Sequence, residues 1–153
     1  GVNSFECRHN LRYWNMETYI GLGPGAVSSI YGKEQKKRIT NTINIAQYVK
    51  LLNPMHLKTE AFQEIEMLSD FDWLFEHYMM GYRLSRGIDR PAFFNRFLKY
   101  PEELIPETIA NWSLNGFIND GTYSLNDAGL LLLNKFLSDV YDELKKISCK
   151  IQF

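Results

Sequence analysis

The chain has 153 residues, of which 45% are hydrophobic, and a formal net charge of −1. This length suits one globular domain, or one domain with an appended arm, without the help of disulfide bonds. The small net charge argues against a dedicated nucleic-acid-binding protein, since such proteins usually carry a basic surplus. No apolar run approaches the roughly 20 residues that span a bilayer, and the first residues do not resemble a signal peptide. We therefore expect a cytoplasmic protein without a membrane span.

Residues 1–40 are rich in glycine, aromatic residues and short apolar alternations. This pattern predicts strands and turns with little helix, including a strand near residues 27–31 and a solvated turn at residues 33–38. The segment is too short to close a core, so we expect it to continue a larger sheet whose other strands are missing. An unpaired edge within residues 1–31 would then offer a route to dimers.

From residue 41 onward the helical period of apolar residues predominates. Start and stop signals predict four helices before residue 117. They begin at Asn41 or Thr42, Ser69, Asp89 and Pro106, and the first, second and fourth end at Asn53, Gly87 and Gly116.

Residues 117–125 predict a β-hairpin, because Asp120-Gly121 between two short apolar pieces is a strong hairpin signal. Asn126 is expected to cap a last helix, whose apolar residues form one continuous stripe from Leu130 to Ile147. Helix, helix, hairpin and helix in this order are winged-helix-like. The predicted fold class is therefore α+β and mostly helical, with a short β and loop segment at the start.

A short segment, His9-Asn10-Leu11-Arg12-Tyr13-Trp14, combines an imidazole, an amide and two large aromatic rings. His9 has two interpretations: a packed, hydrogen-bonded side chain, or an iron ligand with Tyr13 and Trp14 stacked on a flat macrocycle. Cys7 lies two residues earlier, and on a strand its thiol would share a face with the imidazole as a candidate second ligand. The other two histidines, His56 and His77, are expected to be structural.

The segment Gly21-Leu22-Gly23-Pro24-Gly25-Ala26 formally matches the dinucleotide-binding pattern GxGxxA. Its context does not fit, since the next residues favour a strand and residues 39–48 contain no acid. Two interpretations stay open: a loop that comes close to a ligand because no side chain intervenes, and a tight corner between strands.

The spacing of polar residues shows no nucleophile, base and acid arranged for catalysis, so we expect no catalysis by this chain alone. The two cysteines, Cys7 and Cys149, lie at opposite ends of the chain. Zinc or iron–sulfur ligation from this chain alone is therefore not expected.

Two motifs together carry a family resemblance. They are Cys7-Arg8-His9-Asn10-x-x-Tyr13-Trp14 and Tyr19-x-Gly21-x-Gly23-Pro24-Gly25-Ala26-x-Ser28. The chain resembles the C-terminal portion of the oxygen-independent coproporphyrinogen III oxidase-like radical S-adenosylmethionine proteins. It is most similar to their heme chaperone branch, to which the HNxxYW box belongs. Residues 80–89 and 116–129 agree with the family pattern in order and spacing.

The resemblance implies that residues 1–40 are the C-terminal edge of a radical S-adenosylmethionine barrel and residues 41–153 a helical accessory domain. It makes His9 the candidate heme ligand. Asn10, Tyr13 and Trp14, together with Gly21, Gly23, Gly25, Ala26 and Ser28, would lie near the tetrapyrrole or S-adenosylmethionine. The family's CxxxCxxC motif for a [4Fe–4S] cluster does not occur in this sequence. The cluster and S-adenosylmethionine are thus expected only in a full-length parent.

The function that the resemblance implies is to hold heme and deliver it to an acceptor protein, with the parent's own N-terminal barrel as a partner. An alternative is the substrate lid of a true coproporphyrinogen III oxidase, an enzyme of porphyrin biosynthesis that decarboxylates a porphyrinogen. A third interpretation, a DNA-binding winged helix, is disfavoured because residues 106–125 contain no lysine or arginine.

Overall fold

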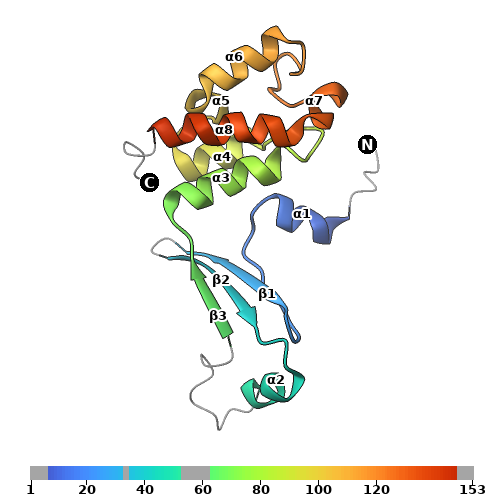
Figure 1. The fold of residues 1–153 in the computed structure, drawn as a ribbon, viewed down its shortest axis with the longest axis vertical. Coiled ribbons are helices and arrows are strands. Elements are labelled where there is room, and N and C mark those ends of the chain that lie inside the picture. Colours follow the sequence, from blue (N-terminus) through green and yellow to red (C-terminus); the bar gives the residue numbers. More distant parts are fainter. Residues whose placement is uncertain (1–6, 33–34, 53–62, 148–153) are drawn as a thin grey trace. The chain divides into compact units, whose positions relative to one another are not determined.

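The computed structural model describes residues 7–32, 35–52 and 63–147. The chain forms two compact units, one of Glu17–Ser69 and one of Gly1–Met16 with Asp70–Phe153. The first holds a small sheet and the second is helical (Figure 1), which confirms the α+β class. Among the described helices, none has the length and apolar character that crossing a bilayer requires.

The sheet unit contains three antiparallel strands in the order β1-β2-β3 (Figure 1). They are β1 (Val27–Tyr31), β2 (Lys36–Asn41) and β3 (Gln63–Met67). The strand predicted near residues 27–31 is confirmed. The turn predicted at residues 33–38 is wrong for Lys36–Arg38, which belong to β2. Pairing with β3 stabilises this basic segment as a strand, because Arg38 lies opposite Glu66 and forms an ion pair with it at 2.9 Å.

The sheet unit also contains a short helix, α2 (Ile45–Leu51), whose N-cap is Asn44. The Asn44 side chain accepts a hydrogen bond from the Gln47 backbone N–H at 3.1 Å. The predicted caps were Asn41 or Thr42, and this prediction is wrong because Asn41 is the buried last residue of β2. The predicted stop at Asn53 lies outside the described residues.

The helical unit contains all the other helices. They are α1 (Arg8–Trp14), α3 (Asp70–Gly81), α4 (Arg90–Phe97), α5 (Pro101–Leu104), α6 (Pro106–Leu114), α7 (Asp127–Leu131) and α8 (Leu133–Ile147). Two predicted caps are confirmed, because Asp89 accepts from the Ala92 N–H and Asn126 from the Gly129 N–H, each at 2.9 Å.

The hairpin predicted over residues 117–125 is also confirmed. Ile118 pairs with Leu125 in an antiparallel bridge, and Gly121 in the turn between them adopts a left-handed φ of 79°. Two predicted helix lengths are wrong. Helix α3 ends at Gly81, where Ile88 folds back so closely that an added Cβ would lie 2.3 Å from its side chain. The last helix is divided into α7 and α8 at Leu132.

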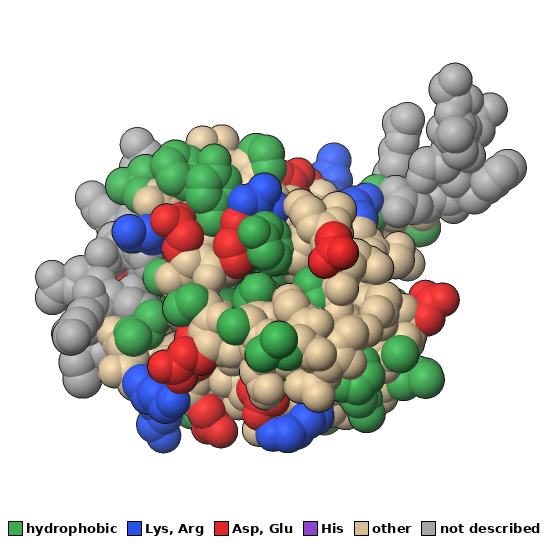
Figure 2. Space-filling model, turned by 90° about the horizontal axis from the view of Figure 1, so that it is seen from above, with side chains coloured by type: hydrophobic (Ala, Val, Ile, Leu, Met, Phe, Trp, Pro, Cys, Tyr) green, Lys and Arg blue, Asp and Glu red, His purple; other side chains and the backbone are tan. Residues whose placement is uncertain are grey.

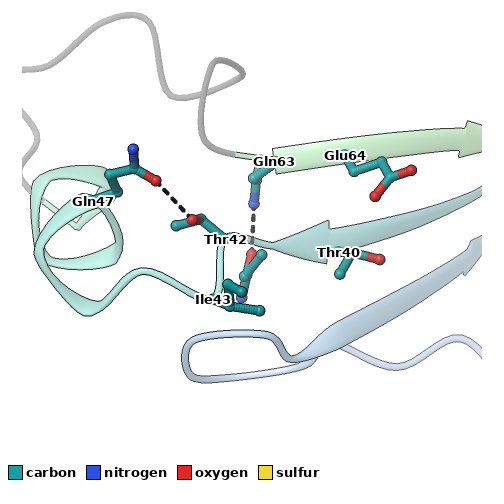
Figure 3. A pocket seen from close by; sticks show the side chains of 7 residues that line it. Thr40, Thr42, Ile43, Gln47, Gln63 and Glu64 are labelled. Atoms are coloured by element: carbon teal, nitrogen blue, oxygen red, sulfur yellow. Dashed lines mark hydrogen bonds between the residues drawn. The ribbon is translucent and has the colours of Figure 1, made fainter.

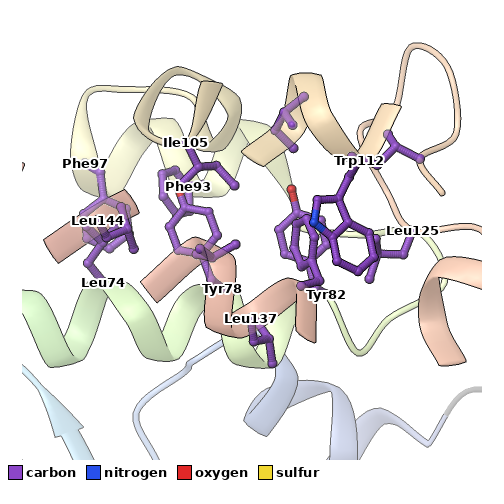
Figure 4. Packing of buried hydrophobic residues seen from close by; sticks show 14 residues of the cluster. Leu74, Tyr78, Tyr82, Phe93, Phe97, Ile105, Trp112, Leu125, Leu137 and Leu144 are labelled. Atoms are coloured by element: carbon purple, nitrogen blue, oxygen red, sulfur yellow. The ribbon is translucent and has the colours of Figure 1, made fainter. Parts of the chain in front are cut away.

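In the described part of the chain, the buried hydrophobic residues other than Met16 form one cluster in the helical unit (Figure 4). Phe136 of α8 is fully buried, and its ring centroid lies 4.5 Å from that of Tyr82 and 5.0 Å from that of Trp112. The buried Tyr78 hydroxyl donates to the Pro101 carbonyl oxygen at 2.8 Å. Every buried hydrophobic residue of the described part of the chain belongs to this unit. The helical unit therefore supplies most of the stability that hydrophobic burial can give.

A buried carboxylate of α8 caps α6 from outside that helix. Glu143 is 7% exposed, and its two oxygens accept hydrogen bonds from the backbone N–H groups of Glu107 at 2.9 Å and Thr108 at 2.7 Å. These donors belong to the first turn of α6, whose N-cap residue Ile105 makes no side-chain cap bond. Glu143 thus satisfies two N–H groups that the helix leaves unpaired.

Replacing Glu143 with alanine should lower the free energy of unfolding by about 2 kcal/mol, because two buried donors lose a charged acceptor. The variant Glu143→Gln should lose less, since it keeps one acceptor oxygen. Urea unfolding followed by far-UV circular dichroism measures the difference. The control is Glu107→Ala, which removes an exposed carboxylate from the same turn and should change stability by less than about 0.5 kcal/mol. Equal effects of Glu143→Ala and the control would contradict the cap.

Candidate functional site

The HNxxYW residues lie on α1, in the helical unit. The Tyr13 hydroxyl is 3.0 Å from His9 Nε2, within hydrogen-bond distance, and the two rings meet edge-on with centroids 5.1 Å apart. This contact follows from the helix, which places residues four apart on the same face. His9 and Asn10 are exposed, whereas Tyr13 and Trp14 are half-buried. The arrangement offers an accessible imidazole beside the Tyr13 ring.

The strand expected for this segment is wrong, and so is the argument that placed Cys7 and His9 on one face. Cys7 is the exposed N-cap residue of α1, outside its helical residues. Residues two apart on a helix point in different directions. The aromatic residues suggested a strand, but α1 packs on α3, and this tertiary contact outweighs the local preference. The structure therefore gives no support to Cys7 as a second ligand.

His77 is structural, as predicted, whereas His56 lies outside the described residues. His77 Nδ1 is 2.7 Å from the Trp73 carbonyl oxygen, to which it donates, and Nε2 lies 2.9 Å from Arg96 Nη1. Burial lowers the pKa of His77 from its ordinary value of 6.5 to about 4, against an opposing hydrogen bond to Trp73, and the charge of Arg96 lowers it further. The imidazole is therefore neutral at physiological pH, with both nitrogens engaged.

The glycine loop, residues 21–26, lies in the sheet unit. Gly23 and Gly25 have φ values of 117° and 69°, a region that favours glycine. A Cβ at Gly21 would lie 2.3 Å from the Val27 carbonyl oxygen, so only glycine fits there. The Gly21 N–H donates to Ser28 Oγ at 3.0 Å, while Ala26 accepts from the Asn41 N–H at 2.9 Å. The φ values at Gly23 and Gly25 and the lack of space at Gly21 explain why each of these positions is glycine. This supports the interpretation of the loop as a tight corner.

The loop is held by residues that the sequence did not single out for this role. Asn41 is 6% exposed, and its Nδ2 donates to the carbonyl oxygens of Gly23 at 3.0 Å and Gly21 at 3.4 Å. The Tyr48 hydroxyl accepts from the Gly23 N–H at 2.9 Å. Gln63 in turn donates to Asn41 Oδ1 at 2.9 Å. Asn41 and Tyr48 lie 18 and 25 residues along the chain from Gly23, so no local pattern could have found them.

A hollow of about 450 Å³ lies beside this clamp, where β2 ends and α2 begins (Figure 3). Its lining is mostly amide, hydroxyl and carboxylate; the residues are Thr40, Asn41, Thr42, Ile43, Gln47, Gln63 and Glu64. Within it, Thr42 Oγ1 donates to Gln47 Oε1 at 2.8 Å. Among the described residues, those that line the hollow carry no imidazole and no thiol.

The predicted site residues thus fall into two groups. Those of the HNxxYW box share one helix, where His9 contacts Tyr13, while those of the glycine loop share one turn in the other compact unit. Each group is a defined local structure.

Six curated proteins match the chain, and each is named heme chaperone HemW. The identity is 24% over 141 residues with the protein of Bacillus subtilis, covering 91% of this chain and 35% of the relative. With that of Lactococcus lactis it is 31% over 109 residues, covering 71% and 26%. With that of Haemophilus influenzae it is 25% over 136 residues, covering 87% and 33%. The chain belongs to the family of these heme chaperones.

Membership of the HemW family confirms the resemblance that the HNxxYW box and the glycine loop indicated. The chain spans about a third or less of the length of the curated relatives reported above, between 26% and 35%. No family model and no solved structure matches it. The activity of a whole HemW protein therefore cannot be transferred to this chain from the comparison alone.

Heme fits the residues present, whereas an iron–sulfur cluster does not. In the described part of the chain, no three histidine, cysteine, aspartate or glutamate side chains gather into a metal site. Heme needs no such group, because the porphyrin supplies four nitrogens and the protein adds an axial ligand such as an exposed imidazole. A [4Fe–4S] cluster needs a set of cysteine thiolates, and the whole sequence has two cysteines.

Proposed function

We propose that this chain is the C-terminal part of a heme chaperone in which His9 would bind the heme iron. The observation that carries this proposal is the exposed imidazole on α1 in contact with Tyr13, on the helix that also carries Trp14, in a chain whose curated relatives are named heme chaperones. The imidazole nitrogen is a common ligand for heme iron, and the rings supply an apolar wall.

Iron has to compete with Tyr13 for His9 Nε2. One hydrogen bond between exposed groups contributes only about 1 kcal/mol, because water replaces either partner. The phenol can therefore turn away when iron binds, while Asn10 and Trp14 keep their places on the helix. Tyr13 and Trp14 would then lie against the macrocycle.

The glycine loop would approach the tetrapyrrole or S-adenosylmethionine in the full-length protein. Space for a Cβ is open at Gly23, with nothing within 4 Å, so the backbone there can come close to a flat ligand. Gly21, Gly25, Ala26 and Ser28 would shape the loop, and Asn41 would hold it rigid.

The parent would supply the rest of the machinery. In this proposal residues 1–40 form the edge of a radical S-adenosylmethionine barrel, and residues 41–153 form an accessory domain with a winged-helix-like end. The [4Fe–4S] cluster and S-adenosylmethionine would bind only in the parent, and heme would pass to an acceptor protein. The length of the relatives supports the idea of a longer parent. The cytoplasmic location and dimerisation through residues 1–31 stay predictions.

Two other functions receive less support. The relatives reported above are named chaperones, and none is named an oxidase, so the substrate-lid interpretation has no observation in its favour. Binding of DNA would need a basic face. Helix α6, which precedes the hairpin, has no basic residue in its last turn. The face in Figure 2 carries acidic and basic side chains among hydrophobic ones, with no block of a single sign.

Titration of the chain with hemin, followed by visible absorption, tests the proposal. We expect a saturable Soret shift that is lost in His9→Ala and kept in His56→Ala, which removes a histidine outside the box. An unchanged shift in His9→Ala would contradict the ligand assignment, and so would the absence of any shift in the unaltered chain. Anaerobic conversion of coproporphyrinogen by the intact parent would contradict the chaperone function.

A further inference from the structure

Helix α1, which carries His9, is too short to be stable alone. It has seven residues, and its N-cap residue Cys7 makes no side-chain cap bond. Isolated helices shorter than about 12 residues are marginal in water. A ligand on such a helix has a defined direction only if other parts of the fold hold the helix in place.

The contacts that hold α1 gather at its C-terminal end. Met16, just after the helix, is 5% exposed and adopts a left-handed φ of 53°. The carbonyl oxygen of Asn15, the C-cap residue, accepts a hydrogen bond from Arg96 Nη1 at 2.9 Å. A cation at this position also interacts favourably with the negative end of the helix dipole.

His77 orients the arginine that makes this contact. The same Nη1 atom of Arg96 lies 2.9 Å from His77 Nε2, and its two N–H groups allow one for each acceptor. His77 can accept only because its Nδ1 carries the proton that it donates to the Trp73 carbonyl oxygen. The rings of Trp73 and Phe97 lie edge-on to the imidazole at 5.0 and 4.9 Å, and they fix its plane.

We propose that Arg96, held by His77, is a positioning residue for the heme ligand His9. It ties the end of α1 to α3 and α4, and a rigid helix then fixes the imidazole, which lies six residues or about 9 Å further along the axis. Pre-organising the ligand in this way lowers the entropic cost of binding. The inference rests on the proposed function of His9, whereas the tie itself is a property of the heme-free fold.

Arg96→Met tests the tie, because methionine keeps an apolar stem and removes the donors. Hydrogen exchange of the heme-free chain should become about tenfold faster at the amides of residues 8–16, with α3 and α8 unchanged. The affinity for hemin should fall by a similar factor, and the low-spin ferric signal should broaden because the imidazole direction varies. Arg96→Lys, which keeps a cationic donor, should restore part of both effects.

The matched control is Arg83→Met. Arg83 is exposed and also donates to a backbone carbonyl oxygen, that of Met79 at 2.6 Å, which belongs to α3 and not to α1. It should change neither exchange in α1 nor hemin affinity. If Arg96→Met also speeds hydrogen exchange in α3 and α8, the milder variant Arg96→Lys tests the tie instead. It should speed exchange less than Arg96→Met does, and only at residues 8–16.

Unchanged exchange at residues 8–16 in Arg96→Met would overturn the tie. Faster exchange with unaltered hemin affinity and an unaltered ferric signal would overturn the positioning role. If the unaltered chain binds no hemin, the proposed function fails, while the exchange experiment still decides whether Arg96 holds α1.

Discussion

Replacing Phe136 with alanine should lower the free energy of unfolding by about 3–5 kcal/mol, because it opens a cavity in the core of the helical unit. Phe136 is fully buried, and its ring contacts Tyr82 at 4.5 Å and Trp112 at 5.0 Å between centroids. Tyr82 directly follows α3 and Trp112 lies on α6, so the ring joins α8 to α6 and to the residue after α3. The two large partners cannot collapse fully into the space that it leaves.

Urea unfolding followed by far-UV circular dichroism measures this loss. The matched control is Leu131→Ala, since Leu131 is 88% exposed and its removal should change stability by less than about 0.5 kcal/mol. A loss below about 1 kcal/mol for Phe136→Ala would contradict the central place of this ring in the core.

The stability of the helical unit should fall by about 3 kcal/mol as the pH is lowered from 6.5 to about 4, through His77 alone. Above pH 6.5 the imidazole is neutral in both the folded and the unfolded chain, so the contribution is complete. Between the two values the unfolded chain binds a proton that the folded chain cannot accept, because burial and Arg96 disfavour the imidazolium. Below the folded pKa of about 4 both states are protonated and the loss is complete.

The difference between two stability curves isolates this effect from the titration of carboxylates. The unaltered chain and His77→Gln are unfolded by urea at a series of pH values, and the glutamine variant should lack the extra loss between pH 6.5 and about 4. His9→Ala, which removes an exposed imidazole, should keep it. Parallel curves for the unaltered chain and His77→Gln would show that His77 is not buried as a neutral ring.

The sequence predicted the features that depend on contacts within a few residues. Asp89 and Asn126 cap helices through the N–H three residues later, and Asp120-Gly121 closes a hairpin. Such side-chain-to-backbone contacts leave a local signature, because residue type and spacing alone determine them. The strand at residues 27–31 and the start of α6 at Pro106 were also predicted, from the alternation of apolar residues and from the preference of proline for the first turn of a helix.

The sequence did not predict features that distant partners impose. Residues 8–14 have a strand-like composition, yet they form α1, whose end is held by Arg96, 81 residues from Asn15. The glycine loop depends on Asn41 and on Tyr48, which lies 25 residues from Gly23. In each case the deciding hydrogen bond joins elements that only the tertiary fold brings together.

The candidate site was foreseen through its motifs rather than through its geometry. The HNxxYW box indicated the family and made His9 the ligand candidate. The edge-on contact of His9 with Tyr13 required the helix that the sequence pattern did not favour. Likewise, only the structure shows that the Val27 carbonyl oxygen leaves no room for a side chain at Gly21.

The most direct test of the account is to identify the atom that binds the heme iron. Pulsed electron paramagnetic resonance of the ferric heme complex, with the chain carrying ¹⁵N-labelled histidine, detects a nitrogen bound to iron. If His9 binds the iron, the complex should show a ¹⁵N coupling that disappears in His9→Ala and persists in His56→Ala. A coupling that survives in His9→Ala, or none in the unaltered complex, would contradict His9 as the heme ligand.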